Sequence, residues 1–561
     1  MKKSQQALIL AAVYVLALGV RVYWLSQKEG LHVDEGLTIA LACCNGFFVS
    51  DNYEYGKKYT GKELKEASLV SDASLRGALA DVRSLWKDNR DPPHTNLYYT
   101  FLRLSLIGLK TGDIAPIVVR GGILNLLFFT VSFMFFFRLM QLLFSRNKLL
   151  QYAAVFCAFM STAAISNTLF IRPYQIQETL FIIFCYYFVL SIGWQKYIFH
   201  ENNLFITAKP IILMSLITAV TLMTGYYALI FVGLFGLYAI YLLCANKRFI
   251  EIPFYFVVLC FGILFAQVLY PKYVSGFFSY RGQETIRTLS GNKLKNIQES
   301  MGSAGTFLHE HFFTFPVIAV CVLCLAYIII TLIREHKLRI TKISANFTLK
   351  KMTWYIFAAS VLYLFIVLII APYKVLRYGM PVFPFLIILP AMLINAIGPR
   401  AQLRVRNIAA GAALLLCGCF AFAAVRGNNI ENIFRGKPDR YAFTQDKDTP
   451  VYVINHGAWS LWKYANLIPY VHDEQAYYFI DWGTYFDEYR KGQENISIEL
   501  PEVQDYDTIY LVIEYFNNFP LFDELMENVP VQGAVESEFE IYTGEPESEF
   551  PYFKGKKIMI N

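Results

Sequence analysis

The feature that most constrains the fold is a series of long apolar runs that recurs along the first 425 residues. A helix that crosses a membrane needs about 20 consecutive apolar residues, and several runs reach that length. Of the 561 residues, 56% are hydrophobic and only 17% are charged. Soluble globular proteins rarely have this composition. The sequence therefore predicts a polytopic α-helical membrane protein.

Eleven spans are predicted, because the long run 211–244 is divided in two at residues 224–227. Basic turns alternate with the spans, and Lys2 and Lys3 precede the first, so the positive-inside rule predicts a cytoplasmic N-terminus in a cell membrane. Residues 96–109 are short and are predicted to lie on the membrane surface, with a short span as the alternative. The expected spans are 7–25, 117–144, 149–168, 176–194, two within 211–244, 252–270, 313–333, 354–370, 378–397 and 408–425.

The end of the chain differs from the rest in charge. From residue 426 onward it holds 24 Asp and Glu against 11 Lys and Arg, a net charge of −13, which leaves +20 for the remainder. We therefore predict a basic transmembrane domain, residues 1–425, and an acidic, soluble extracytoplasmic domain, residues 426–561. The larger outer loops of the membrane domain are expected at 26–116 and 271–312.

The acidic domain carries strand-like runs at 450–454, 508–513 and 557–560. Helix-compatible stretches at 460–467 and 521–528 lie between them, and this alternation predicts a small α/β domain. None of the ten cysteines lies in this domain. A disulfide framework is therefore not expected there.

An adjacent acidic pair, Asp34-Glu35, follows the first apolar run. One interpretation is helix capping, because carboxylates favour the first turn of a helix. The other is a general base that takes a proton from an acceptor hydroxyl. An Asp with an ordinary pKa of about 3.9 is ionised at neutral pH and can accept that proton. The two interpretations are compatible, since a capping position also holds a carboxylate rigidly.

A second polar segment, residues 90–94, precedes the aromatic-rich stretch at 96–109. Its two prolines stiffen the entry to a helix, so one interpretation is an ordinary helix start. The unusual feature is the density of Arg90, Asp91 and His94, and the other interpretation is that these side chains contact a donor or an acceptor.

Several cations are predicted at helix ends on the outer side, where positive charge is disfavoured. One interpretation of each is an interfacial anchor whose charge reaches water. The other is a site for lipid phosphate, because Arg and Lys bind phosphate oxygens. These residues and their neighbouring tyrosines are Arg172, Tyr174, Lys272, Lys374, Arg377 and Tyr378.

The order of these motifs resembles the GT-C-fold glycosyltransferases that use lipid-phosphate sugars, which include protein O-mannosyltransferases and the aminoarabinose transferases of lipid A. The resemblance covers about residues 1–425. It departs from the family most at the Pro-Pro segment, where His94 follows the prolines and three residues separate them from Leu97. The matching elements are Asp34-Glu35, Pro92-Pro93, Arg172-x-Tyr174, Thr224-Gly225-Tyr226-Tyr227, and Arg377-Tyr378 with Pro381 and Pro384.

The resemblance implies a GT-C-like fold and an inverting transfer of a sugar from a polyprenyl-phosphate donor to a glycan, lipid or protein acceptor on the extracytoplasmic face. It implies that Asp34 is the base, that Glu35 supports it, and that the four outer cations hold the lipid phosphate. Relatives differ over metal use, so a divalent metal cofactor stays open. Membrane lipid is a further expected partner, and nucleic acid is not.

Two other classes of function stay open. A transporter of a lipid-linked saccharide would need charged groups deep within the spans, and the sequence places few there. A polysaccharide polymerase or ligase also removes a lipid phosphate on the outer face. The acidic pair directly after the first span favours the transferase. The sequence contains no phosphate-cradling P-loop, dinucleotide fingerprint or GxSxG motif.

Overall fold

Contacts within the computed structural model divide the chain into two compact units, each described here by itself. Unit 1 consists of residues 1–24, 91–98 and 125–430, and unit 2 of residues 25–90, 99–124 and 431–561. The predicted domain boundary after residue 425 stays a prediction. The structure describes residues 3–43, 54–69, 72–87, 94–109, 114–198, 204–278, 280–334, 349–397, 403–434, 443–455, 467–481, 499–514, 533–541 and 553–560.

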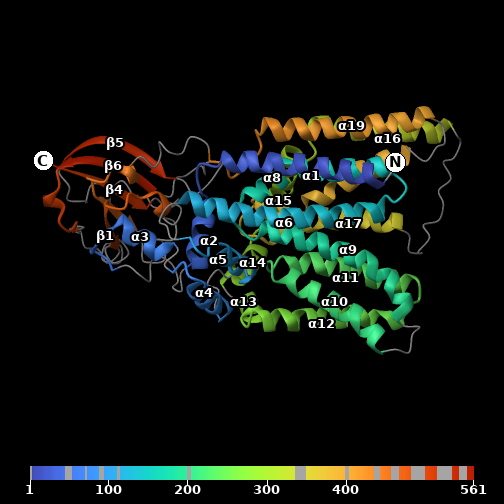
Figure 1. Cartoon of the computed structure of the whole chain (residues 1–561), viewed down its shortest axis with the longest axis horizontal. Helices are drawn as coiled ribbons and strands as arrows, with labels where there is room; N and C mark the ends of the chain where they lie inside the picture. The colour runs from blue at the N-terminus through green and yellow to red at the C-terminus, as the bar shows by residue number, and fades with distance from the viewer. Residues whose placement is uncertain are drawn as a thin grey trace. The chain divides into compact units, whose positions relative to one another are not determined.

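Long apolar helices make up most of the described chain (Figure 1). Eight are long and apolar enough to cross a membrane, or ten if two bent pairs each form one span, and α10 is a shorter apolar helix. These are the eleven segments that the sequence predicts, so the polytopic helical class is confirmed. The side of the membrane on which each helix end lies stays a prediction. The apolar helices outside the bent α7–α8 pair and the span at 378–397 are α1 (Lys3–Ser26), α6 (Ile114–Leu143), α9 (Tyr174–Ile198), α10 (Leu204–Leu222), α11 (Ala228–Ala245), α12 (Ile252–Leu269), α16 (Phe315–Arg334), α17 (Leu349–Ile370) and α19 (Leu403–Arg426).

Two of the spans are broken. Helices α7 (Lys148–Met160) and α8 (Thr162–Leu169) meet at a 54° bend, and α15 (Lys293–His311) meets α16 at 89°. Ser161 separates α7 from α8, and its hydroxyl accepts a hydrogen bond from the Ala164 backbone N–H as the N-cap of α8. The predicted outer loop 271–312 is largely helical, since α13 (Tyr273–Phe277) and α14 (Tyr280–Ser290) precede α15.

The span predicted at 378–397 begins as a 3₁₀-helix rather than an α-helix. Short η3 (Leu376–Tyr378) leads into η4 (Met380–Ile387), and α18 (Ile388–Ile397) completes the span. Pro381 and Pro384 lie in η4 and lack the N–H that an α-helix would require. Another 3₁₀-helix, η2 (Phe249–Glu251), precedes α12.

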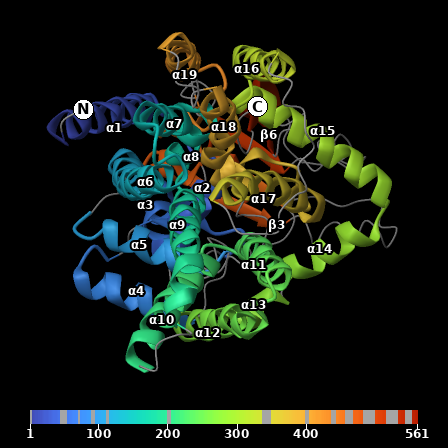
Figure 2. The ribbon, with the colours of Figure 1, turned by 90° about the vertical axis from the view of Figure 1, so that its right-hand side faces the viewer.

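Aromatic side chains fill the space between neighbouring helices of unit 1. Helices α9, α10, α11 and α12 lie side by side in two views (Figures 1 and 2). Phe181 of α9 stacks on Phe231 of α11 with the ring centroids 4.1 Å apart. Interlocking rings of this kind give close packing where the hydrophobic effect does not drive helices together.

Unit 2 contains a six-stranded mixed sheet in the order β1-β3-β2-β4-β6-β5. Strand β2 pairs in parallel with both β3 and β4, and the outer pairs are antiparallel. The first long loop supplies β1, which pairs with β3 far along the chain. The strands are β1 (Lys58–Thr60), β2 (Val451–Asn455), β3 (Ala476–Asp481), β4 (Thr508–Glu514), β5 (Gly533–Ile541) and β6 (Phe553–Ile560), with 3₁₀ turns η7 (Ile468–Tyr470) and η8 (Val503–Asp505).

Both faces of the sheet are buried around β2. Val451 and Val453 enter one apolar cluster, and Tyr452 and Ile454 enter the other. This alternation follows the two-residue period of a strand. Helix α3 (Gly61–Ser68), also from the first loop, adds Leu64 to the first cluster. The helix-compatible stretch 521–528, and all of 460–467 except residue 467, lie outside the described residues.

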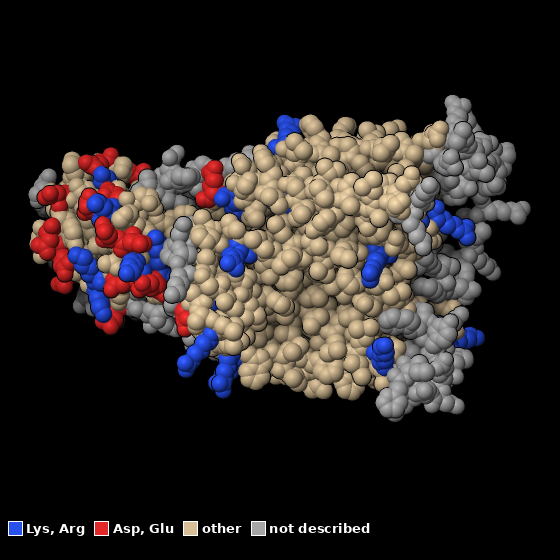
Figure 3. Space-filling view, in the orientation of Figure 1, with Lys and Arg blue, Asp and Glu red and all other residues tan. Residues whose placement is uncertain are grey.

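The remaining helices of the first loop are α2 (Val33–Cys43), α4 (Leu75–Lys87) and α5 (Leu97–Ser105). Helix α5 has nine residues, about 14 Å of helix, which is less than the roughly 30 Å of a hydrocarbon core. This length favours the surface location over the short span. On the face in Figure 3, acidic side chains gather over the sheet, and most of the surface of the long helices is uncharged.

Candidate functional site

The acidic pair forms the first turn of α2, in unit 2. His32 is the N-cap: its Nδ1 accepts a hydrogen bond from the Asp34 backbone N–H at 3.0 Å. Glu35 Oε2 accepts one in return from the His32 backbone N–H at 2.8 Å. This arrangement resembles a capping box, but the His32 ring accepts from the N–H of Asp34, one residue earlier than in a standard box. The helix begins here because two of its otherwise unpaired N–H groups find acceptors.

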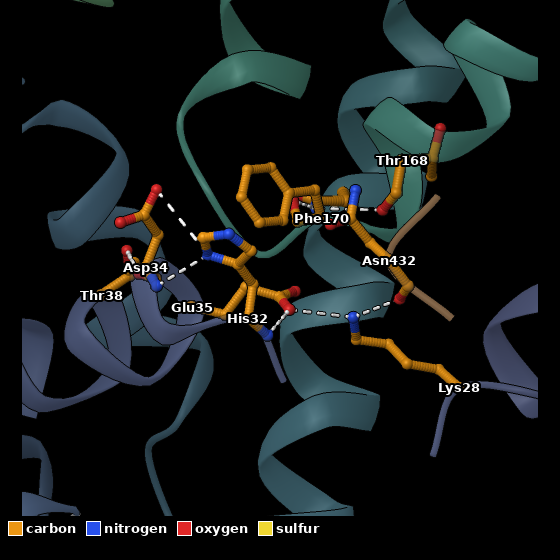
Figure 4. A network of polar contacts seen from close by, with 9 residues as sticks. Lys28, His32, Asp34, Glu35, Thr38, Thr168, Phe170 and Asn432 are labelled. Atoms are coloured by element: carbon orange, nitrogen blue, oxygen red, sulfur yellow. Dashed lines mark hydrogen bonds and ion pairs between the residues drawn. The ribbon is translucent and has the colours of Figure 1, made fainter. Parts of the chain in front are cut away.

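A buried ion pair joins Glu35 to Lys28, in the segment between α1 and α2 (Figure 4). Lys28 Nζ lies 3.0 Å from Glu35 Oε2, and both side chains are fully buried. The same Nζ donates to the Asn432 carbonyl oxygen at 2.7 Å and lies 5.1 Å from the ring centre of Phe434. Lys28 was not singled out from the sequence. It links the first loop to the segment after α19.

The two carboxylates of the pair therefore have different environments. Glu35 has its charge neutralised by Lys28, while the Asp34 side chain is 17% exposed. The Asp34 carboxylate lies 3.8 Å from His32 Nδ1. The Asp34 backbone carbonyl oxygen accepts a hydrogen bond from the Thr38 hydroxyl at 2.7 Å. The positive end of the α2 dipole favours the ionised form of a carboxylate in this turn. Of the pair, Asp34 is the one whose side chain is partly exposed.

In unit 1, aromatic rings from four of the segments discussed under the sequence, at residues 94, 174, 227 and 378, contact one another. Tyr174, at the start of α9, packs against the His94 ring at 5.7 Å and the Tyr378 ring at 6.3 Å between centroids. Tyr378 also packs edge-on against Tyr227 at 5.5 Å, and the Arg377 guanidinium lies 5.7 Å from the Tyr378 ring centre. We call these five residues the aromatic cluster. The side chain of Thr95 fixes the His94 segment by donating to the Met223 carbonyl.

Arg172 lies in the α8–α9 turn, residues 170–173, directly before Tyr174, and its side chain is buried. Asn125 of α6 holds this turn: its Nδ2 donates to the Phe170 carbonyl at 2.8 Å and the Thr168 carbonyl at 3.1 Å. Asn125 Oδ1 in turn accepts from the Tyr98 hydroxyl at 3.0 Å. A single buried amide thus satisfies two carbonyls at the end of α8, where intrahelical partners are missing.

Two fully buried charged residues lie within the spans next to this turn. Arg21 of α1 donates to the Thr168 hydroxyl at 2.9 Å and to the Phe159 carbonyl, which the break between α7 and α8 exposes, at 2.8 Å. Glu178 of α9 accepts from the side-chain amides of Asn167 and Gln175, each at 3.0 Å. Sequence reasoning did not single out Arg21. The signal for it was available, because one cation in the middle of an apolar span is rarely tolerated without a role.

The other predicted phosphate-binding cations have different surroundings. Lys374 Nζ donates to the Leu368 and Ala371 carbonyls at 2.5 and 2.9 Å, so it caps the C-terminus of α17. Burial lowers the pKa of Lys374, and Glu299 partly opposes this effect. Lys272 is exposed at the N-cap of α13, next to Tyr273, whose carbonyl accepts from the Tyr226 hydroxyl.

Some of the predicted residues are not placed. Arg90 and Asp91 lie outside the described residues, so their proposed contacts stay predictions. Asp34 and Glu35 belong to unit 2 and the aromatic cluster to unit 1, and their meeting in one site also stays a prediction. Among the residues that the structure describes, no group of three or more His, Cys, Asp or Glu side chains could hold a metal ion. The nine cysteines within the described ranges are free.

Searches with family models and with curated protein sequences found no match. Solved structures similar to the chain include ArnT from Cupriavidus metallidurans bound to undecaprenyl phosphate, with 11% identity and a TM-score of 0.45 over 99% of this chain and 98% of that one. The apo state of the same protein gives 12% identity and the same TM-score and coverage. At this TM-score the likeness carries no conclusion about fold or function.

Proposed function

We propose that the chain is an integral-membrane glycosyltransferase that transfers a sugar from a polyprenyl-phosphate donor to an acceptor hydroxyl, with inversion, on the extracytoplasmic face. The aromatic cluster is the observation that carries the proposal. It joins rings from four segments at the ends of apolar helices through edge-on and tilted contacts, and the Arg377 guanidinium lies beside one of these rings, that of Tyr378. Guanidinium groups bind phosphate oxygens, and apolar helix surfaces suit a polyprenyl chain.

In the proposed reaction, Asp34 takes the proton of the acceptor hydroxyl. The acceptor oxygen then forms a bond to the anomeric carbon of the sugar, and the bond from that carbon to the phosphate oxygen breaks. The polyprenyl phosphate leaves with the electron pair of the broken bond, and Arg172 and Arg377 stabilise its charge. Asp34 passes its proton to water. One displacement at the anomeric carbon inverts its configuration.

The contacts of the acidic pair support this assignment of the base. A general base must reach the proton that it removes and must be ionised beforehand. Glu35 Oε2 accepts from both Lys28 Nζ and the His32 N–H, and the Glu35 side chain is fully buried. Asp34 is partly exposed in the first turn of the same helix. Glu35 acts as a positioning residue that holds the turn.

A transporter of a lipid-linked saccharide is the second candidate, because Arg21 and Glu178 are charged residues inside the spans. Such residues often mark a substrate pathway. Their contacts favour a structural role instead. Arg21 donates to backbone carbonyls and Thr168, and Glu178 accepts from two amides, so both groups hold the ends of α8 and α9.

The proposal is tested by incubating purified protein with a panel of radiolabelled polyprenyl-phosphate sugars and a membrane extract as the source of acceptors. We expect release of polyprenyl phosphate together with label in one acceptor fraction, and an inverted anomeric configuration in the product. The same sugars on polyprenyl pyrophosphate, or as nucleotide sugars, serve as control donors and should not react.

Three results would contradict the proposal. Reaction with nucleotide sugars would exclude the lipid-phosphate donor class. Retention of configuration would exclude a single displacement with Asp34 as the base. Movement of intact donor across a reconstituted bilayer without any release of polyprenyl phosphate would identify the transporter instead.

A further inference from the structure

A groove of about 480 Å³ lies in unit 1, where α16 begins and α19 ends. Its volume is within the range of about 300–1,000 Å³ that is usual for small-molecule sites. One end is polar and is lined by residues at or beyond the helix ends, including Glu310, Arg426 and Asn428. The other end is lined by apolar residues of α19, Leu415 and Phe422 among them. This division matches an amphiphile, with a polar head and an apolar tail.

Hydrogen bonds hold the residues at the polar end of the groove in place. Thr162 at the start of α8 hydrogen-bonds to His311 Nδ1 at 3.2 Å, and both side chains are buried. Asn429 Nδ2 donates to the Glu310 carbonyl at 2.7 Å, which joins the end of α15 to the segment after α19. Two opposite charges, those of Glu310 and Arg426, therefore line a rigid, polar mouth.

The apolar end is open because it contains a glycine. A Cβ at Gly418 would meet no atom within 4 Å. Leu415 and Phe422 lie three residues before and four residues after it, on the same face of α19, and their side chains are 56% and 67% exposed. In a membrane this face would present a shallow apolar furrow to the acyl chains.

We propose that the groove binds one phospholipid with a primary ammonium headgroup, phosphatidylethanolamine. Arg426 binds its phosphate, Glu310 accepts hydrogen bonds from its ammonium, and an acyl chain lies beside Gly418 between Leu415 and Phe422. Charge complementarity selects this lipid: phosphatidylglycerol offers no cation to Glu310, and phosphatidylcholine offers a cation without N–H donors. The N-terminus of α16, at Thr314 and Pro316, adds a positive dipole end at the mouth. The site does not depend on the proposed glycosyl transfer.

The site is tested by native mass spectrometry of the purified, delipidated full chain mixed with equal amounts of dioleoyl phosphatidylethanolamine, phosphatidylglycerol and phosphatidylcholine. The wild-type protein should carry one phosphatidylethanolamine several-fold more often than either other lipid. G418L fills the furrow and should lose most of this adduct. G411L is the matched control, because Gly411 lies two turns earlier on α19, also has open space at its Cβ position, and does not line the groove.

Two charge variants test the ammonium contact and the phosphate contact of the headgroup separately. E310Q should bring the phosphatidylethanolamine and phosphatidylcholine adducts to equal abundance, and R426Q should weaken all three. Both residues are exposed, so the variants should fold even if G418L does not. Equal retention of the three lipids by the wild type, a preference for phosphatidylglycerol, or an unchanged lipid preference in E310Q would overturn the proposal.

Discussion

The turn before α2 and the α8–α9 turn each present a residue of the proposed reaction, but they are held by different kinds of bond. The α2 turn, in unit 2, depends on charge: Lys28 and Glu35 form a buried pair that fixes the helix start beside Asp34. In the α8–α9 turn, in unit 1, a neutral amide binds the backbone carbonyls, while the charged Arg21 and Glu178 hold the helix ends beside it. Asn125 donates to the Thr168 and Phe170 carbonyls and so fixes the chain just before Arg172.

This difference follows from the surroundings of each turn. The α8–α9 turn joins two apolar helices, where no water replaces a missing partner and every backbone group needs one inside the protein. A single amide with two donors serves this need without adding charge. The α2 turn follows the end of the first span, where the buried pair is compensated by further hydrogen bonds to the Asn432 carbonyl and the His32 N–H. The stability of the α2 turn should therefore depend on the charges of Lys28 and Glu35, and that of the α8–α9 turn on the N–H donors of Asn125.

The largest effect is expected on removing the charge from the α2 turn. E35A leaves Lys28 buried without its carboxylate and should lower the free energy of unfolding by about 3–5 kcal/mol. Denaturant unfolding of the purified protein measures this loss. Adding K28M to E35A removes the stranded cation and should restore part of the stability, since the two residues are coupled.

Glu63 provides a matched control for that change. It forms a capping box with Thr60 at the start of α3, in which the Glu63 carboxylate accepts from the Thr60 N–H as Glu35 accepts from the His32 N–H, but on an exposed surface and without a buried cation. E63A should cost much less than E35A. Equal losses in the two variants would mean that capping, and not the ion pair, holds the α2 turn.

A smaller effect is expected from removing the amide of the α8–α9 turn. N125L leaves the Thr168 and Phe170 carbonyls and the Tyr98 hydroxyl without this partner, at a cost of roughly 1–3 kcal/mol. Because the turn carries Arg172, the KM for the lipid-phosphate donor should rise more than kcat falls. S132A, which removes another α6–α9 hydrogen bond, the one to Thr179, is the control and should leave the donor KM unchanged.

The smallest effect is expected on the donor KM when Arg377 or Lys374, two cations of unit 1, is replaced. R377A should raise the KM for the donor roughly tenfold, equivalent to about 1.4 kcal/mol, because it removes a guanidinium of the aromatic cluster. K374M should leave this KM nearly unchanged, because Lys374 already donates to two carbonyls of α17. Initial rates over a range of donor concentrations measure both. The reverse order would assign the phosphate to Lys374.

The sequence predicts the helical framework well because the membrane imposes a minimum length on each apolar run. The division of 211–244 at residues 224–227 is confirmed by the gap between α10 and α11. The bend at Ser161 was not predicted, since both flanking runs are apolar and a bend leaves the composition unchanged. The bend after His311 lies where the predicted loop 271–312 meets the span predicted at 313–333. Arg21 was missed because one cation hardly alters the mean hydropathy of its span, which stays at 2.1.

The sheet was predicted in part. Strands β2, β4 and β6 coincide with the predicted runs, which are rich in β-branched or aromatic residues. Strand β1 has only three residues, and its pairing with β3 depends on contacts between segments about 400 residues apart, which no local pattern reveals. For the same reason the sequence could suggest Asp34 and Glu35 as a pair but could not assign them separate roles. That separation depends on Lys28, whose bonds to Glu35 and Asn432 appear only in the folded chain.

The most direct test of the account is the rate of polyprenyl-phosphate release by D34N at saturating donor and acceptor. The substitution keeps the shape of the side chain and removes its ability to take a proton. We predict a loss of about 10²–10⁴-fold in kcat with unfolding unchanged, and a wild-type rate for E66Q, a control at an exposed carboxylate of unit 2. A wild-type rate in D34N would contradict the assignment of Asp34 as the base.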